Sequence, residues 1–287
     1  MVMINILWGV SRMTKFLTEK KQIDPRSYLV VQANDFIRHP RTDKLSALEA
    51  NIAYFLISKV KPEDYDFLQV TFTIKEFCQI CGTDEFNDSG KNYRGIKDAL
   101  KSLADKSAWV EVKNGVHQLV RWVDTYIVTD RDGTITATLS QSIKPFLLSL
   151  SDHYSQAELR NYIALKSIYS KRLYDLLRSY IYSGVENTRR YIFPEFEISD
   201  LKKQLNAENY TNFKDFRVNA LERAKNEINA VTDIEMDFEH IKPGRKVTHI
   251  RFTLKLKSPP DRLTAMIKAN KLIECSNTKK LTAQKKK

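Results

Sequence analysis

Basic and amide side chains recur at helical spacing in one stretch of the chain, which runs from Asn212 to Asn229. Such side chains donate hydrogen bonds to phosphate oxygens and to base edges, so the pattern favours contact with nucleic acid. The candidates for this chemistry are Asn212, Lys214, Arg217, Asn219 and Arg223. A solvated surface helix has the same composition, so the neighbouring segments must decide between the two interpretations.

The same stretch carries an apolar stripe that must face a core. Its members are Phe213, Phe216, Ala220, Leu221, Ala224 and Ile228. Lys214 and Asn219 lie off the stripe, near the N-terminal end through which the second helix of a helix-turn-helix contacts bases. Arg217 falls within the angular range of the stripe and could instead pair with an internal acid such as Asp215 or Glu227.

The segments on either side of this helix predict the rest of a DNA-binding unit. FEISDLKKQLN, which begins at Phe196, predicts a short helix before it, and two β-rich runs after it meet at Lys242-Pro243-Gly244-Arg245-Lys246. Short helix, turn, basic helix and β-hairpin is the order of a winged helix-turn-helix. Lys242, Arg245 and Lys246 at the hairpin tip could hold phosphates, which position a protein without reading sequence, although an ordinary solvated turn is the alternative.

An earlier part of the chain repeats this order. TIKEFCQICG, from Thr73, aligns with EISDLKKQLN, from Glu197, and NYRGIK, from Asn92, aligns with NFKDFR, from Asn212. Both copies continue with Ala-Leu and a β-hairpin. By this correspondence Lys91, Arg94 and Lys97 are the DNA-contact candidates of the first copy.

The remaining elements follow from hydrophobic periodicity and turn residues. Strands are expected over 28–37, 68–73, 109–113, 117–129, 134–140 and 190–193. Helices are expected over 45–60, 74–81, 93–106, 143–150 and 159–182, with a loop over 83–92 and a linker over 151–155. The predicted fold class is therefore α+β, with two tandem winged helix-turn-helix domains.

Other residues that could carry chemistry give weaker patterns. Cys78 and Cys81 form a Cys-x-x-Cys pair, but a zinc site needs a second pair, and a redox role favours the start of a helix rather than its end. We therefore expect both cysteines to be structural and buried. No phosphate-binding Gly-rich motif, His-x-His pair or defensible acidic triad is present, so we expect no enzyme activity, no metal and no cofactor.

Composition indicates what kind of partner and which compartment to expect. The formal net charge of +12 suggests a polyanionic partner, although residues 258–287 supply +6 of it. Three cysteines in 287 residues favour a reducing compartment, and no window is apolar enough for a membrane helix, so a cytoplasmic protein is expected. The basic segment 258–287 is expected to be disordered.

With these residues in place, the chain resembles the iteron-binding replication initiators of theta-replicating plasmids. The resemblance lies in VVQANDFI (from Val30), KRLYDLLRSY (from Lys171), DFRVNALERAKNEIN (from Asp215) and GRKVTHIRF (from Gly244), and it covers about Tyr28 to Leu256. Members of the family often have more basic residues directly after the DFR, where this chain has Val218 and Asn219.

The resemblance implies a function and a domain plan. It implies a protein that binds origin direct repeats (iterons) sequence-specifically, helps to open the origin, and recruits the host initiator ATPase and replicative helicase. It also implies a monomer in equilibrium with a homodimer that represses its own gene at an operator inverted repeat. The expected domains are an extension over 1–27, a first winged-helix domain over 28–150 for dimerisation and DNA backbone contacts, a second over 151–257 for main iteron recognition, and the tail over 258–287.

Two alternatives remain open from the sequence. A transcription regulator with two winged-helix domains would bind DNA without a role in replication. A DNA-nicking or recombining enzyme would instead cut the DNA.

Overall fold

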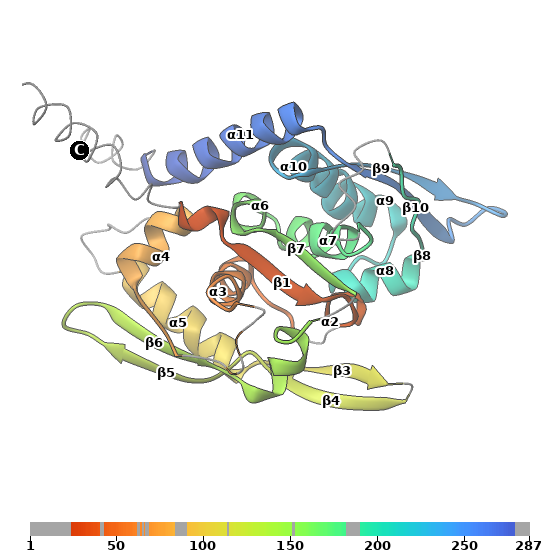
Figure 1. The fold of residues 1–287 in the computed structure, drawn as a ribbon. Helices are drawn as coiled ribbons and strands as arrows, with labels where there is room; N and C mark the ends of the chain where they lie inside the picture. Colours follow the sequence, from red (N-terminus) through yellow and green to blue (C-terminus); the bar gives the residue numbers. More distant parts are fainter. Residues whose placement is uncertain are drawn as a thin grey trace, which may run out of the picture.

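The computed structural model describes residues 24–40, 43–61, 64, 66, 69–83, 91–113, 115–150, 153–181 and 190–278. Figure 1 shows two units side by side, each with helices packed on a small sheet, and the C-terminal helix lying across both. A continuous hydrophobic core runs through the two units. None of the described helices is long and apolar enough to span a membrane.

The first unit contains most of the strands. Its elements in chain order are η1 (Pro25–Ser27), β1 (Leu29–Ala33), α2 (Asn34–Arg38), α3 (Ala47–Ile57), β2 (Val70–Thr73), α4 (Ile74–Cys81), α5 (Lys91–Asp105), β3 (Ser107–Lys113), β4 (Val116–Arg121), β5 (Val123–Thr129), β6 (Thr134–Leu139), η2 (Gln141–Phe146), β7 (Tyr154–Glu158) and α6 (Leu159–Ala164).

The second unit follows the same plan with fewer strands. Its elements are α7 (Ile168–Arg178), β8 (Glu195–Glu197), α8 (Ile198–Leu205), α9 (Phe213–Phe216), the π-helical turn η3 (Arg217–Glu222), α10 (Arg223–Val231), β9 (Ile234–Ile241) and β10 (His249–Leu256). The last element, α11 (Pro259–Thr278), packs on α10 of this unit and on α4 and α6 of the first.

Sheet topology confirms the duplication inferred from the sequence. In the first unit the strand order is β2-β6-β5, and in the second it is β8-β10-β9. In both, the strand before the short helix pairs with the last strand of the hairpin, and all the pairs are antiparallel. The chain therefore consists of two tandem winged-helix domains.

One expected strand is two strands in different sheets. The segment 117–129 divides at Trp122, so that β4 pairs with β3 while β5 pairs with β6. Trp122 is buried, and its indole N–H donates to Asp43 Oδ2 at 2.8 Å. This anchored side chain separates the strands, and it makes β3–β4 an extra hairpin that the second unit lacks.

The expected long helix over 159–182 is also wrong, because the chain leaves the helical conformation at Leu165 (ψ 132°). The backbone N–H groups of Lys166 and Ser167 both donate to Glu227 Oε2, at 2.9 and 3.1 Å. The Ser167 hydroxyl then caps α7 by accepting from the backbone N–H of Tyr169. A carboxylate from α10 of the second unit thus stabilises the break between α6 and α7.

Shorter segments differ in smaller ways. The expected strand over 28–37 is β1 followed by the short helix α2, and the expected helix over 143–150 is a 3-10 helix, η2. Part of the expected linker over 151–155 belongs to β7, which pairs with β1, while residues 151 and 152 lie outside the described residues. The expected loop over 83–92 lies mostly outside them too.

The expectation of a disordered tail is wrong for residues 259–278, which form α11. Ala265, Ala269 and Ile273 are spaced four residues apart and are all buried. Ser258 and Asp261 are hydrogen-bonded at the start of the helix, where such residues satisfy free backbone N–H groups. Because one helical face is buried against both units, the helix is held by packing. Residues 279–287 lie outside the described residues.

Candidate nucleic-acid interface

The helix-turn-helix of the second unit is built around a left-handed residue. Helix α8 ends at Asn206, whose φ of 52° turns the chain sharply, a conformation that Asn tolerates better than most residues. Lys202 Nζ donates to the Tyr210 carbonyl at 2.6 Å and closes the turn. The next helix begins at the N-cap Asn212, whose side chain accepts from the backbone N–H of Asp215 at 2.8 Å.

Helices α9, η3 and α10 form one continuous recognition helix from residue 213 to residue 231. Its inner face is fully buried and consists of Phe216, Ala220, Leu221, Ala224, Ile228 and Val231. Its C-terminal half is tied to β9, because Lys225 pairs with Asp237 at 2.5 Å and Asn229 exchanges two hydrogen bonds with the Met236 backbone. The outer face of the N-terminal half is left for a partner.

The buried ammonium group of Lys257 closes the other end of this helix. Its Nζ donates to the carbonyls of Asn229 and Thr232, each at 2.7 Å, where a helix has unpaired acceptors. Burial lowers the pKa of Lys257 to about 8. A cation at the C-terminal end also complements the helix dipole.

The predicted contact residues of this helix have different surroundings. Lys214 and Asn219 are exposed, whereas Arg223 forms an ion pair with Glu227 at 3.1 Å. Asn212 is exposed but is engaged in capping. Arg217 is half-buried, and its Nε has no hydrogen-bond partner among the described residues.

The structure also bears on the alternative partners of Arg217. Asp215 accepts instead from Asn212, at 2.7 Å, and Glu227 accepts from Arg223 and from two backbone N–H groups. No ion pair joins Arg217 to either acid within the described part of the chain. A buried guanidinium N–H without an acceptor is costly.

The hairpin β9–β10 is the wing of the second unit. Lys242, Arg245 and Lys246 at its tip are exposed, and none is ion-paired with a carboxylate in the described ranges. The tip end of β9 lies beside the start of the recognition helix, since the rings of Phe213 and His240 are 5.8 Å apart. Free cations at the tip and the N-terminal half of the helix therefore belong to one end of the unit.

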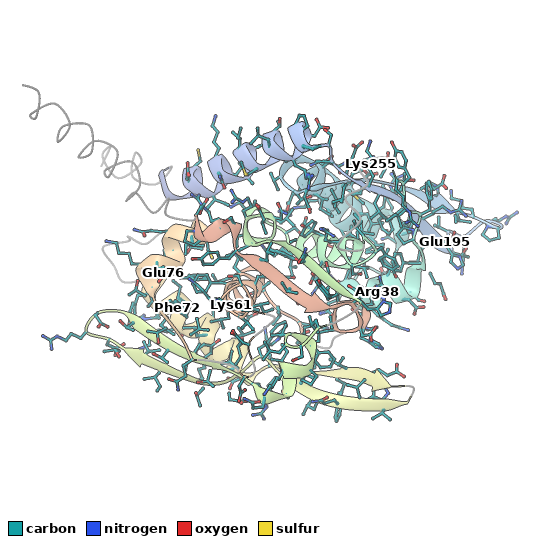
Figure 2. The ribbon with its side chains drawn as sticks, in the orientation of Figure 1. Arg38, Lys61, Phe72, Glu76, Glu195 and Lys255 are labelled. Atoms are coloured by element: carbon teal, nitrogen blue, oxygen red, sulfur yellow. The ribbon has the colours of Figure 1, made fainter. Side chains whose placement is uncertain are left out.

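The cations on the outer face of the adjacent sheet are neutralised, in contrast to those at the tip. Arg251 pairs with Glu195 at 2.9 Å and with Glu239 at 3.2 Å, and Lys255 pairs with Glu235 at 3.3 Å. Figure 2 shows Glu195 and Lys255 on this sheet, away from Phe72 and Glu76 of the first unit. The charge pattern favours phosphate contact at the tip over the sheet face.

The first unit offers fewer free cations at the corresponding place. Arg94 is exposed on α5, but Lys97 pairs with Asp130 at 2.9 Å and lies 5.4 Å from the centre of the Tyr93 ring. The Tyr93 hydroxyl also donates to Asp130, which raises the pKa of Tyr93 to about 12 and lowers that of Asp130. The side chain of Lys91 lies outside the described residues. Asp130 thus weakens the basic character expected of this helix.

The two cysteines are buried in α4, as predicted. Burial raises the pKa of the Cys81 thiol well above its ordinary value. A neutral thiol is a poor nucleophile and a poor metal ligand. Among the described residues no three His, Cys, Asp or Glu side chains form a group that could hold a metal ion.

The sequence did not reveal the polar seam between the two units, which is formed by α7. Asp175 is buried and accepts from Gln32 at 3.3 Å and from the hydroxyls of Tyr54 and Tyr162, each at 3.2 Å. All three donors belong to the first unit. Removing such a carboxylate leaves several buried donors without an acceptor, so the seam constrains how the units sit together.

Other polar residues of α7 extend this seam. Arg172 donates to the Asp43 carbonyl at 2.9 Å, and Lys171 Nζ donates to the Tyr162 carbonyl at 2.5 Å. Lys171 is 1% exposed, and burial lowers its pKa to about 7. These contacts bind the second unit to the first through the polar side chains of α7.

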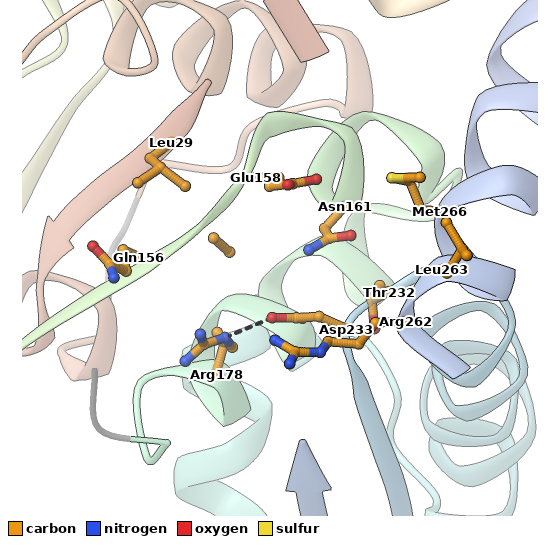
Figure 3. Close-up of a pocket in the computed structure, with 11 residues that line it drawn as sticks. Leu29, Gln156, Glu158, Asn161, Arg178, Thr232, Asp233, Arg262, Leu263 and Met266 are labelled. Carbon is orange, nitrogen blue, oxygen red and sulfur yellow. Dashed lines mark hydrogen bonds and ion pairs between the residues drawn. The ribbon is translucent and has the colours of Figure 1, made fainter. Parts of the chain in front are cut away.

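A cavity of about 330 Å³ lies in the seam, between β1 and β7, α7 and α11. Figure 3 shows Arg178 pointing toward Asp233 in this cavity, with Leu263 and Met266 of α11 on the opposite side. Arg178 Nε and Asp233 Oδ2 are 3.0 Å apart, and the Tyr174 hydroxyl also donates to Asp233. Arg178 and Asp233 therefore satisfy one another, and the cavity lies at the C-terminal end of the recognition helix, away from the half that holds Lys214 and Asn219.

Comparison with known proteins gives two family matches and a structural one. Residues 29–178 match the family model described as "Initiator Replication protein, WH1", and residues 197–254 match "Initiator Rep protein, WH2". The fold is similar to a crystal structure of the Pi initiator protein in complex with iteron DNA, with a TM-score of 0.64 and 17% identity, covering 81% of this chain and 99% of that one.

Proposed function

The chain belongs to the replication initiator protein family with WH1 and WH2 domains, and on that premise we propose that it is a plasmid replication initiator that binds the iterons of its origin. The observation that carries this proposal is the exposed N-terminal half of the recognition helix next to a wing tip with unpaired cations. The likeness to the Pi protein, which is bound to iteron DNA, supports the same ligand. Family membership favours this function over a transcription regulator or a DNA-nicking enzyme.

Base reading is assigned to the recognition helix of the second domain. Lys214 and Asn219 present exposed donors to the major groove, and the half-buried Arg217 lies between them in the sequence. Lys214→Ala or Arg217→Ala is expected to cost about 1–3 kcal/mol in binding and to relax discrimination at particular base pairs. Titration of a set of singly substituted repeats measures this, and equal weakening on every sequence would contradict the assignment.

Phosphate contact is assigned to the wing. Arg245→Ala or Lys246→Ala is expected to lower affinity evenly across sequences and to reduce the slope of log affinity against log salt by about one. Lys268→Ala on α11 is the matched control, because Figure 1 shows that helix running away from the hairpin tip. If a wing variant had the same salt dependence of affinity as the control, the wing would not be part of the DNA interface.

Self-association is assigned to the first domain. Trp109 and Leu119 are cross-strand neighbours on the extra hairpin β3–β4 and are 53% and 43% exposed, while Val110 and Val120 face the core. An outward apolar pair on one copy can pack on the same pair of a second copy around a two-fold axis. The dimer proposed here represses the initiator's own gene at an inverted repeat.

Sedimentation of the purified chain over a range of concentrations tests this interface. Trp109→Lys is expected to shift the population to monomer, while Phe193→Ala, which alters an exposed aromatic of the second domain, leaves it unchanged. Equal dimerisation of both variants would reject the hairpin as the interface.

The remaining steps of initiation depend on other proteins. Bound to its repeats in the cytoplasm, the chain helps to open the origin and recruits the host initiator ATPase and replicative helicase, with no chemistry of its own. Supercoiled origin DNA incubated with the chain, these host proteins and ATP is expected to become sensitive to a single-strand-specific probe. Nicked DNA or a protein–DNA adduct formed by the chain alone would instead show an enzyme.

A further inference from the structure

Val218 is an unusual residue on the recognition helix. It is 48% exposed, whereas Phe216, Ala220 and Leu221 around it are at most 1% exposed. Between residues 213 and 231, all described, no other aliphatic side chain larger than Ala is exposed. The packing of the domain therefore does not account for a branched apolar side chain at this position.

The position of Val218 places it among the base-reading candidates. It follows Lys214 by four residues, which puts the two on one face of the helix, and it adjoins Asn219. It also lies within the π-helical turn Arg217–Glu222, a local irregularity that often marks functional positions. The contacts that hold the helix, from Lys225 and Asn229 to β9, lie in its other half.

Only one group on the major-groove edges of base pairs is apolar, namely the C5-methyl of thymine. Asn beside it would pair with the N6 and N7 atoms of an adenine. We propose that Val218 reads a thymine in the iteron by packing on its C5-methyl, next to an adenine bound by Asn219. This inference rests on the proposed iteron binding and assigns a specificity-determining contact within it.

Deoxyuridine tests the contact, because it removes the methyl group and keeps the base pairing of thymine. Each thymine of one repeat is replaced singly, and the full chain is titrated on each duplex. Wild type is expected to lose about fourfold in affinity at one or two positions, the effect of one buried methyl-sized group. Val218→Ala is expected to bind the natural repeat about as weakly as wild type binds the uracil-substituted repeat. Its affinity is expected to be insensitive to uracil at that position alone.

Two further variants separate this contact from a general effect. Val218→Thr keeps one methyl group in the same shape and is expected to retain part of the uracil response. Ile267→Ala, which trims a 58% exposed side chain on α11, is expected to match wild type on every duplex. Circular dichroism confirms that each variant is folded.

The outcomes distinguish this inference from the proposed function. Sequence-specific binding with no uracil-sensitive thymine, or with a sensitive thymine that Val218→Ala still reads, overturns the role of Val218 and leaves the initiator function intact. Unchanged affinity of Val218→Ala for the natural repeat overturns it too. A wild-type chain that binds no direct repeat overturns both.

Discussion

Helix α11 provides a quantitative test of how the two domains are held together. It follows the second domain, yet Ile273 is fully buried against Gly82, at the end of α4 in the first. Ile273→Ala removes three carbon atoms, each worth about 0.8 kcal/mol on burial, and leaves a cavity that adds to the loss. We therefore expect the free energy of unfolding to fall by about 2–5 kcal/mol.

Urea unfolding followed by circular dichroism measures this change, and Ile267→Ala on the same helix is its control. Ile267 is 58% exposed, so the same truncation there is expected to change stability by no more than about 0.5 kcal/mol. Amide exchange adds a local readout, since a loosened α11 exchanges faster than α3. Equal losses for the two variants would refute the reasoning, because they would show that α11 is not held by this buried face.

Three more predictions concern contacts between the two domains. Gly82→Ala is expected to displace α11 or destabilise the fold, because φ is +65° and the new Cβ would lie 2.5 Å from the Ile273 carbonyl oxygen; proteolytic cleavage within α11 measures it. Asp175→Ala is expected to lower the free energy of unfolding in urea by about 3–5 kcal/mol, because three buried donors lose their acceptor at roughly 1–3 kcal/mol each, and Asp175→Asn is expected to lower it by less. Burial lowers the pKa of Lys171 from 10.5 to about 7. Between pH 7 and pH 10.5 the Lys171 amine is therefore protonated in the unfolded chain but neutral in the folded chain. The free energy of unfolding of wild type relative to Lys171→Met is therefore expected to rise from pH 7 to pH 10.5. The same pH dependence of stability in both proteins would contradict this.

The winged-helix plan could be predicted because its signals are local. Apolar residues at helical spacing, Gly82 at a helix end and two turn-rich hairpins lie within short windows, and their repetition in one order strengthens each. The same kind of signal was present for α11, in Ser258, Asp261 and the four-residue spacing of Ala265, Ala269 and Ile273. There the high density of lysine suggested a solvated tail and outweighed the helical pattern.

The seam could not be predicted in this way, because its polar residues have distant partners. Lys171 and Asp175 follow the helical pattern of a solvated face, and only folding brings Gln32, 143 residues away, to the carboxylate. The break before α7 likewise depends on Glu227, 60 residues beyond Ser167. A charged residue is expected to be exposed unless a partner is known, and no local window contains these partners.

The two domains share a plan but differ in how much charge they leave free. In the first, Asp130 in the hairpin turn binds Tyr93 and Lys97 and so neutralises one cation of the helix that corresponds to the recognition helix. In the second, the hairpin tip keeps three exposed cations, and the acids nearby are engaged in holding the helix to β9 and to α7. Glu227 is the clearest case, since it fixes the break before α7 and pairs with Arg223 at once. The recognition helix is therefore bonded directly to the residues that begin α7, the helix whose polar side chains contact the first domain.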